Sequence, residues 1–433
     1  MSFEPVYIID GARSPFLKSR NEPGPFSASD MAVQTSRELL LRQPFDAREL
    51  GEVIVGCAAP APDETNIGRV VALRLGIGHH VPAWSVMRNC ASGMQALDSA
   101  LMSIQAGRYD LALAGGVDAL SRAPLLLSAD MARWMGRWSR AHTLRERAQV
   151  LQGVRPHHLK PVIGLVEGLT DPVTGLSMGQ TAENLAHQFG ITRNQMDEYA
   201  ARSHALVRRA RERHQFDDEL VPLTDPQGNV YEHDDGVRDD STPGKLAQLK
   251  PVFDRPYGNI TAGNSSQVSD GACMLLLASA RAVERYGLQP LGRILDVHWA
   301  GLDPAVMGLG PVYAASPILQ RHGLGLNDID VWEINEAFDA QVLACRQAWN
   351  DDTWCQTHLG HGALGELDMD KLNITGGAIA IGHPVGASGA RIVLRALHLL
   401  KERQEKIAMA AICIGGGQGG AMLLESFGGA QEP

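Results

Sequence analysis

Short apolar runs without polar alternation recur along the first part of the chain. They span residues 6–10, 52–56, 83–87 and 111–116. Such runs are typical of strands that are covered on both faces of a sheet. Three segments between these runs have apolar residues on one helical face. They are a segment that runs to about Leu41 and that Ser29-Asp30 is expected to cap, residues 66–75, and the stretch after Gly93. This order predicts an α/β domain with layers of helix and sheet.

The pattern changes between residues 123 and 250. Residues 133–147 are rich in Trp and Arg, 162–169 are apolar and interrupted by glycine, and 193–214 are plainly helical and strongly charged. We expect an insertion that covers one face of the α/β core. The 162–169 run could dock on a membrane or a partner protein, although a loop packed against its own domain is the simpler interpretation.

The layered pattern returns after residue 250. Strands are expected at 273–278, 292–297, 330–334 and 408–414, helices at 312–322, 336–349 and 387–400, and irregular structure at 353–370. Ala91-Ser92-Gly93 and Ala387-Ser388-Gly389 each start a helix, and each helix is followed by a strand that ends in paired glycines. This weak self-similarity indicates a duplicated domain whose two helix N-termini meet at one site. We therefore divide the chain into a first core half (1–122, completed by 251–288), a loop domain (123–250) and a second core half (289–433).

Composition narrows the class of protein. Of the 433 residues, 44% are hydrophobic and 20% charged, and the net charge is −10, which argues against a dedicated nucleic-acid binder. The six cysteines lack metal-ligand or disulfide-framework spacing, and no secretory leader or apolar run of about 18 residues is evident. We expect an intracellular, cytoplasmic protein.

The most informative stretch is Asn89-Cys90-Ala91-Ser92-Gly93, which lies at a strand-to-helix turn. Partial positive charge at a helix N-terminus favours thiolate, and small neighbours let a substrate come close. Cys90 is therefore either a nucleophile or, as is common for a lone cysteine, a buried structural residue.

The second half supplies possible partners for Cys90. His383 lies among glycines and a proline just before a helix, and an imidazole there could act as its base. Cys413 ends a strand and is followed by Gly415, whose backbone N–H belongs to a glycine-rich run suited to an oxyanion hole. Asn335 ends another strand and is a second potential oxyanion donor or water holder.

A dinucleotide-binding site and a metal site are the two competing interpretations, and the surrounding sequence supports neither. Gly415, Gly417 and Gly420 match a dinucleotide-binding pattern, but a strand-like segment follows instead of a helix with a distal acidic residue. The pairs His79-His80 and His157-His158 have no carboxylate or cysteine partner at a recognisable spacing. We expect neither a nucleotide cofactor nor a metal.

Five motifs in the same order resemble those of the thiolases, the acetyl-CoA C-acyltransferases. They are Asn89-Cys90-Ala91-Ser92-Gly93, Asn264-Ser265-Ser266, Asn335-Glu336-Ala337-Phe338, the stretch from Gly376 to Pro384, and Cys413-Ile414-Gly415-Gly416-Gly417. The similarity runs from about Val6 to Glu425. It implies a duplicated five-layer α-β-α-β-α fold with an inserted loop domain, assembled as a homodimer or homotetramer.

The resemblance also implies a role for each site residue. Cys90 is expected to take the acyl group, His383 to activate it, and Cys413 to act as the second acid/base. Asn335 is expected to position a water in one oxyanion hole, while the backbone N–H groups of Cys90 and Gly415 form the other. Substrate and CoA contacts are expected from Ser266, Met307 and Met178. Ser177 stands where short-chain biosynthetic members carry His, which leaves the chain-length preference open.

The expected activity is thiolytic cleavage of 3-ketoacyl-CoA to acetyl-CoA and a shortened acyl-CoA, as in fatty-acid β-oxidation, or the reverse condensation. Coenzyme A would be a substrate and no cofactor is needed. A thiolase of this kind could work with a β-oxidation partner subunit. The alternatives are a biosynthetic acetyl-CoA C-acetyltransferase specific for acetoacetyl-CoA and a non-catalytic lipid carrier. A decarboxylating ketoacyl synthase is disfavoured by Cys413.

Overall fold

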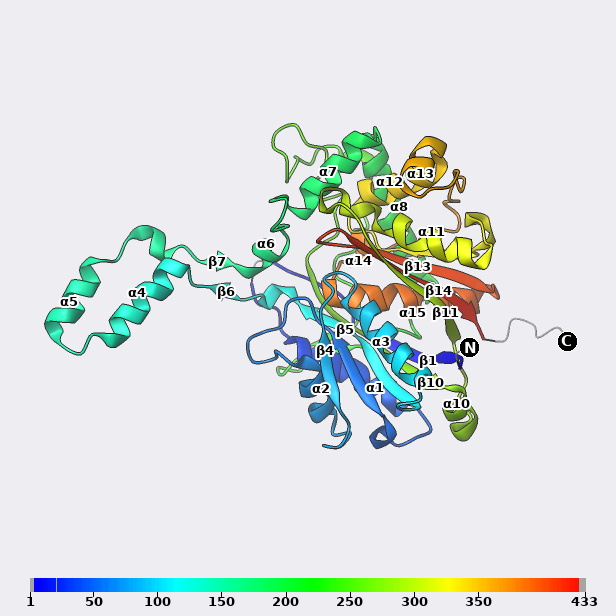
Figure 1. Cartoon of the computed structure of the whole chain (residues 1–433), viewed down its shortest axis with the longest axis horizontal. Coiled ribbons are helices and arrows are strands. Elements are labelled where there is room, and N and C mark those ends of the chain that lie inside the picture. The colour runs from blue at the N-terminus through cyan, green and yellow to red at the C-terminus, as the bar shows by residue number, and fades with distance from the viewer. Residues whose placement is uncertain (1–3, 21, 428–433) are drawn as a thin grey trace.

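The computed structural model describes residues 4–20 and 22–427, and two similar halves make up its body (Figure 1). The strands of the first half are β1 (Val6–Arg13), β2 (Leu17–Lys18), β3 (Glu52–Gly56), β4 (Ala83–Val86), β5 (Leu111–Ala119) and β10 (Ser269–Ser279). Those of the second half are β11 (Gly292–Gly301), β12 (Val331–Ile334), β13 (Ile407–Ile414) and β14 (Gln418–Ser426). All ten belong to one sheet.

The order of the strands confirms the duplication. The sheet runs β4-β3-β5-β10-β1 through the first half and continues β11-β14-β13-β12 through the second. In each half the outer strands pair in parallel and the inner strands antiparallel, as β3 with β5 and β12 with β13 show for the parallel pairs. Counted outward from the β1–β11 pair, the two halves therefore repeat the same order of antiparallel and parallel strand pairs.

Helices form the remaining layers. The first half has α1 (Ala28–Leu41), α2 (Ile67–Leu75), α3 (Ser92–Gln105) and α10 (Ala280–Tyr286). The second has α11 (Gly310–His322), α12 (Asp339–Asn350), α13 (Asp352–His358), α14 (Ala378–Ile381) and α15 (Val385–Arg403). The α3 and α15 helices contact each other, and α15 touches strands of both halves, so they form the middle layer. This arrangement is the five-layer fold predicted from the sequence.

Local chemistry explains where two of these elements begin and end. The cap of α1 is Ser27, whose hydroxyl accepts from the backbone N–H of Asp30 while the Asp30 carboxylate accepts from the N–H of Ser27. The prediction of Ser29-Asp30 was therefore wrong by two residues, because Ser29 instead bonds to the carboxylate of Glu64. The predicted irregular stretch 353–370 is also partly wrong, since α13 occupies its start with Asp351 as its cap.

The region inserted into the first half, residues 123–250, does not simply cover the core. Its elements are β6 (Leu125–Leu126), α4 (Ala129–Arg140), α5 (Leu144–Gln152), β7 (Val162–Ile163), α6 (Gly164–Gly168), α7 (Met178–Gln188), α8 (Arg193–Glu212), β8 (Leu223–Thr224), β9 (Val230–Tyr231) and α9 (Pro243–Leu246). The α7 and α8 helices pack on the second half, as expected. Residues 125–163, here called the arm, instead project away from the body on the paired strands β6 and β7 (Figure 1).

Candidate active site

The site lies where the first turns of α3 and α15 meet. A β-carbon on Gly93 would lie 2.7 Å from the carbonyl oxygen of Gly386, and one on Gly116 would lie 2.0 Å from the same oxygen. Both positions must therefore be glycine for the two helix starts to approach this closely. The duplicated fold thus brings Cys90, two residues before α3, and His383, two residues before α15, to neighbouring helix N-termini.

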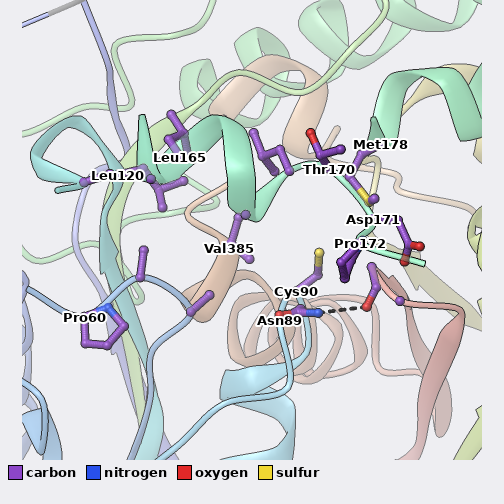
Figure 2. Close-up of a pocket in the computed structure, with 18 of the residues that line it drawn as sticks. Pro60, Asn89, Cys90, Leu120, Leu165, Thr170, Asp171, Pro172, Met178 and Val385 are labelled. Carbon is purple, nitrogen blue, oxygen red and sulfur yellow. Dashed lines mark hydrogen bonds between the residues drawn. The ribbon is translucent and has the colours of Figure 1, made fainter. Parts of the chain in front are cut away.

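The turn that carries Cys90 is held by Asn89. Asn89 has a left-handed backbone (φ 44°), a conformation that asparagine tolerates better than most residues. Its side-chain Nδ2 donates to the carbonyl oxygen of Gly415 at 2.8 Å (Figure 2). One side chain therefore connects the Cys90 turn of the first half to the glycine-rich strand end of the second.

Two backbone donors face the sulfur of Cys90. The N–H groups of Gly415 and of Cys90 itself lower the pKa of the thiol, but burial has the larger effect and raises it. The helix N-terminus alone therefore does not produce a thiolate, contrary to the simple expectation from sequence. A base is needed to remove the proton, and the two N–H groups remain available to an oxyanion.

His383, which was predicted as that base, is held in place by Ser388. The Ser388 hydroxyl donates to the carbonyl oxygen of Pro384 at 2.9 Å and lies 2.6 Å from Nδ1 of His383. Because that hydroxyl proton is used, Nδ1–H of His383 donates to Ser388 and Nε2 carries the lone pair. Burial lowers the pKa of His383 to about 4, and its Nε2 has no hydrogen-bond partner within the described residues. The imidazole is thus neutral and free to accept a proton at Nε2.

Cys413 lies in β13 and is a neighbour of Cys90. Burial and the neighbouring Cys90 sulfur raise the pKa of the Cys413 thiol well above its ordinary value. Cys413 is fully buried, so it stays protonated and can donate a proton when a carbanion forms beside it.

Asn335 follows β12, at the same sheet edge as the end of β13. Its backbone N–H donates to the carbonyl oxygen of Ala411, while neither side-chain polar atom of this fully buried residue has a partner in the described chain. Leaving a buried amide unpaired costs on the order of 1–3 kcal/mol, so such a side chain is suited to hold a water or a substrate oxygen. The next residue, Glu336, is fixed by hydrogen bonds from Tyr199, Ser203 and Asn373.

A cavity of about 450 Å³ opens above Cys90 (Figure 2). Asn89, Cys90, Gly415 and Met178 form one part of its wall. Residues of α6, of the loop after β3 and of the segments 120–124 and 169–173 form most of the rest. Of the residues predicted for substrate and CoA binding, only Met178 lines this cavity. Met307 is buried in the same apolar cluster as Cys413, and Ser266 pairs with Ala337 through a backbone hydrogen bond. Neither lines the cavity, and their roles stay predictions.

Two residues of the site region were given no role from sequence. One is Asn89, which was recognised only as part of the motif around Cys90 and whose bond to Gly415 was not predicted. The other is Asp118 at the end of β5, fully buried, whose carboxylate accepts hydrogen bonds from the N–H groups of Ala58, Ala59 and Gly386. It ties the cavity wall of the first half to the start of α15. No spacing rule marks a lone carboxylate of this kind.

Metal-ligating groups converge at one place within the described residues. Nε2 of His157 lies 3.5 Å from a carboxylate oxygen of Asp130, and His158 completes the group. The predicted lack of a carboxylate partner for His157-His158 was therefore wrong, because α4 brings Asp130 beside them. The other carboxylate oxygen of Asp130 binds Arg133 at 2.5 Å, and this positive charge disfavours a cation.

Comparison with known proteins gives a consistent result. Residues 6–281 match the family model for the thiolase N-terminal domain, and residues 288–426 match that for the thiolase C-terminal domain. The chain is 37% identical over 423 residues to a 3-ketoacyl-CoA thiolase of Serratia proteamaculans, covering 97% of this chain and 96% of that protein. A 3-ketoacyl-CoA thiolase of Pectobacterium atrosepticum is 36% identical with the same coverage.

Solved structures agree. The Bacillus anthracis acetyl-CoA acetyltransferase superposes with a TM-score of 0.85 at 36% identity, covering 98% of this chain and 100% of that one. The human mitochondrial 3-ketoacyl-CoA thiolase in complex with CoA gives 0.83 at 32% identity, with 98% of each chain covered. The fold and the matched length define the class, and the chain belongs to the thiolase family.

Proposed function

We propose that this protein is an acyltransferase that cleaves 3-ketoacyl-CoA with coenzyme A, giving acetyl-CoA and an acyl-CoA two carbons shorter. The observation that supports it most is the presence of two chemically distinct thiols close enough to influence each other: Cys90, which lines the cavity, and the buried Cys413, whose pKa the Cys90 sulfur raises. A hydrolase needs one nucleophile, whereas carbon–carbon cleavage through a thioester needs a nucleophile and a separate proton donor.

In the first half-reaction, Nε2 of His383 takes the proton of the Cys90 thiol as the sulfur attacks the 3-keto carbon. The tetrahedral oxyanion is stabilised by one of the two oxyanion sites, which are the Asn335 side and the pair of N–H groups on Cys90 and Gly415. The bond between carbons 2 and 3 then breaks. The electron pair of that bond goes to the acetyl-CoA enolate, which Cys413 protonates, and the acyl group stays on Cys90.

In the second half-reaction, the thiol of coenzyme A gives its proton to the Cys413 thiolate that the first half-reaction leaves, and the CoA sulfur attacks the acyl-Cys90 thioester. The acyl group moves to CoA, the Cys90 sulfur leaves, and the proton held by His383 restores the Cys90 thiol. Coenzyme A is a substrate throughout. Run backwards, the same steps make a 3-ketoacyl-CoA from two acyl-CoA molecules.

The names of the relatives fit both forms of this chemistry, since some are called 3-ketoacyl-CoA thiolase and others acetyl-CoA acetyltransferase. The second candidate is accordingly an acetyltransferase specific for acetoacetyl-CoA. No helix among the described residues has the length and apolar character required to cross a bilayer. We further propose a cytoplasmic homodimer or homotetramer that serves β-oxidation, alone or with a partner subunit.

A thiolysis assay tests the proposal. Purified protein is mixed with CoA and either acetoacetyl-CoA or 3-ketooctanoyl-CoA, and loss of the enolate absorbance is followed. Cleavage of both substrates supports the 3-ketoacyl-CoA thiolase, and cleavage of acetoacetyl-CoA alone supports the second candidate. No cleavage of either substrate would overturn the proposal.

A further inference from the structure

A second cavity lies between α8 and the end of α15, away from Cys90. Its volume is about 410 Å³, within the usual range of about 300–1,000 Å³ for ligand pockets. Leu399 and Arg403, from the last turns of α15, form part of its wall. Since a helix rises about 1.5 Å per residue, they lie about 21 and 27 Å along the axis from the first residue of α15. The two cavities share no lining residue among those that the structure describes, so this is a separate place in the molecule.

Arginine is the most frequent residue in this wall. Arg202 and Arg209 belong to α8, and Arg213 follows its last residue. Their spacing of seven and four residues places them on one helical face, together with Leu206. Arg403 joins them from α15. Two helices that are far apart in the sequence therefore bring four guanidinium groups to one cavity.

Carboxylates neutralise only part of this charge. Arg403 pairs with Glu405 at 2.8 Å, and Asp370 is the one acidic residue of the wall within the described chain. Among the same residues, Arg209 and Arg213 have no carboxylate oxygen within 4.0 Å. Asp370 and Glu405 thus leave two of the four positive charges uncompensated, in a chain whose net charge is −10. Such a local excess favours a bound anion.

Two buried polar groups of the wall also lack a partner in the part of the chain that the structure describes. Thr375 is only 3% exposed, and its hydroxyl makes no hydrogen bond there. Arg202 donates from Nη2 to the carbonyl oxygens of Met369 and Leu372 at 2.6 and 3.0 Å, while its Nη1 stays unpaired. Unpaired buried donors are costly, so each such group calls for an explanation. An oxyanion in the cavity would supply the missing acceptor.

The wall favours an anion that carries an apolar part. Beside the arginines it contains Leu206, Ala210, Ile374 and Leu399. The planar fork of arginine matches two oxygens of a phosphate, and a phosphate with more than one negative charge can pair with two arginines at once. Inorganic phosphate would leave the four apolar side chains facing water, whereas the ring and sugar of a nucleotide would cover them.

We infer that this cavity binds a small phosphorylated organic molecule of the nucleoside diphosphate class, with Arg202, Arg209 and Arg213 around its phosphates. The inference goes beyond the proposed function, because the cleavage of 3-ketoacyl-CoA uses none of these residues. The ligand is held apart from Cys90 and His383, at the opposite end of α15.

The experiment is calorimetric titration of the full chain with ADP. We expect ADP to bind the wild type, and its Kd to rise at least about tenfold when Arg209→Gln and Arg213→Gln are combined, because two charge-assisted hydrogen bonds are lost. Arg208→Gln is the matched control. Arg208 lies on the same helix but donates to the carbonyl oxygen of Asp239 and does not line the cavity, so the Kd should stay within about twofold. All three arginines are exposed, so the variants should fold.

A parallel titration with inorganic phosphate separates the two sources of the phosphate group. We expect it to bind at least about tenfold more weakly than ADP, and equal affinity would overturn the assignment to a nucleotide. Absence of ADP binding, or ADP binding that the double variant leaves unchanged, would overturn the inference while leaving thiolysis intact. A KM for CoA that rises in the double variant as much as the Kd for ADP would also overturn it, because the cavity would then be the CoA site. Absence of thiolysis in the wild type would instead be a failure of the proposed function.

Discussion

The helices that begin at the site and those that cover the sheet differ in their first turn. Side-chain oxygens of Ser27, Asn66 and Thr192 cap α1, α2 and α8. Ser177 caps α7 as well, although the first residue of α7, Met178, lines the cavity. In contrast α3, α12, α14 and α15, which start at or beside the site, have no side-chain cap. The α6 and α11 helices also lack one, but α11 has a proline in its first turn, which removes a free N–H.

A side-chain cap contributes about 1 kcal/mol to stability by satisfying N–H groups that have no partner within the helix. Where a helix at the site has no side-chain cap, its first backbone N–H groups remain able to donate to other acceptors. One of them, the N–H of Gly386, is taken by Asp118, and the N–H of Cys90, just before α3, faces the sulfur. In the capped helices a side chain of the protein accepts from a first-turn backbone N–H. In α3 and α15 no side chain caps the first turn, so its backbone N–H groups can serve other partners.

Replacing Cys90, the proposed nucleophile beside the uncapped start of α3, should have the largest effect. We expect Cys90→Ala to lower kcat for acetoacetyl-CoA thiolysis by at least about 10⁴-fold, because no thioester can form. The thermal unfolding midpoint should change little, since the side chain is only half-buried. Activity within tenfold of wild type would show that Cys90 is not the nucleophile.

The pH dependence of Cys90 acylation tests the protonation state of His383, just before α15. Because burial lowers the pKa of His383 to about 4, the imidazole is already neutral at neutral pH and is protonated only in stronger acid. The rate of Cys90 acylation should therefore hold as the pH falls from about 8 to about 5.5 and decline only nearer pH 4. Stopped-flow release of acetyl-CoA measures it. A decline centred near pH 6.5 would mean that His383 is solvated like an ordinary histidine.

Replacing Cys413 separates the two thiols. We expect Cys413→Ala to lower kcat by about 10²–10⁴-fold, because protonation of the enolate then lacks its positioned donor. Cys90 should remain reactive, since its N–H donors and His383 are untouched, and alkylation by iodoacetamide at the wild-type rate checks this. Loss of alkylation together with turnover would assign Cys413 a structural role.

Replacing Asn89, which holds the turn before the uncapped α3, should lower activity less than replacing Cys90 or Cys413. Asn89→Gly keeps the left-handed backbone but removes the bond to Gly415, so we expect kcat/KM to fall by about 10- to 100-fold as the Cys90 turn loosens. Steady-state kinetics measures the fall. An unchanged kcat/KM would show that the turn holds without the bond.

The smallest effect is expected from removing the side-chain cap of a helix away from the site. Thr192→Ala removes the capping box of α8 and should lower the free energy of unfolding by about 1 kcal/mol, with no change in kcat. Urea unfolding followed by circular dichroism, with the exposed Arg213→Ala as control, measures this. A loss of activity without loss of stability would contradict the division between the two kinds of helix.

Much of this architecture could be predicted from the chain. Apolar runs and helical spacing gave the layered α/β class, and the repeated Ala-Ser-Gly starts indicated the duplication that the sheet order confirms. Family membership followed from five motifs and is confirmed by the family models. The domain boundaries at 122, 250 and 288 and the roles of the site residues stay predictions.

Other features depend on contacts that one sequence does not reveal. The arm was expected to cover the core, but its Trp and Arg residues pack on their own helical hairpin, as the bond from Trp134 to the carbonyl of Val150 shows. The role of Asp118 depends on three N–H groups brought together by tertiary structure. The raised pKa of Cys90 was missed because a helix N-terminus is visible in sequence while burial is not.

The most direct test of the account locates the acyl group. Wild-type protein is mixed with a 3-ketoacyl-CoA in the absence of free CoA, quenched in acid and mapped by peptide mass spectrometry. We predict one acyl group, on the peptide that contains Cys90, in the wild type and at lower yield in Cys413→Ala, and none in Cys90→Ala. An acyl group on Cys413, or a wild-type Cys90 that stays unmodified while acetyl-CoA is released, would contradict it.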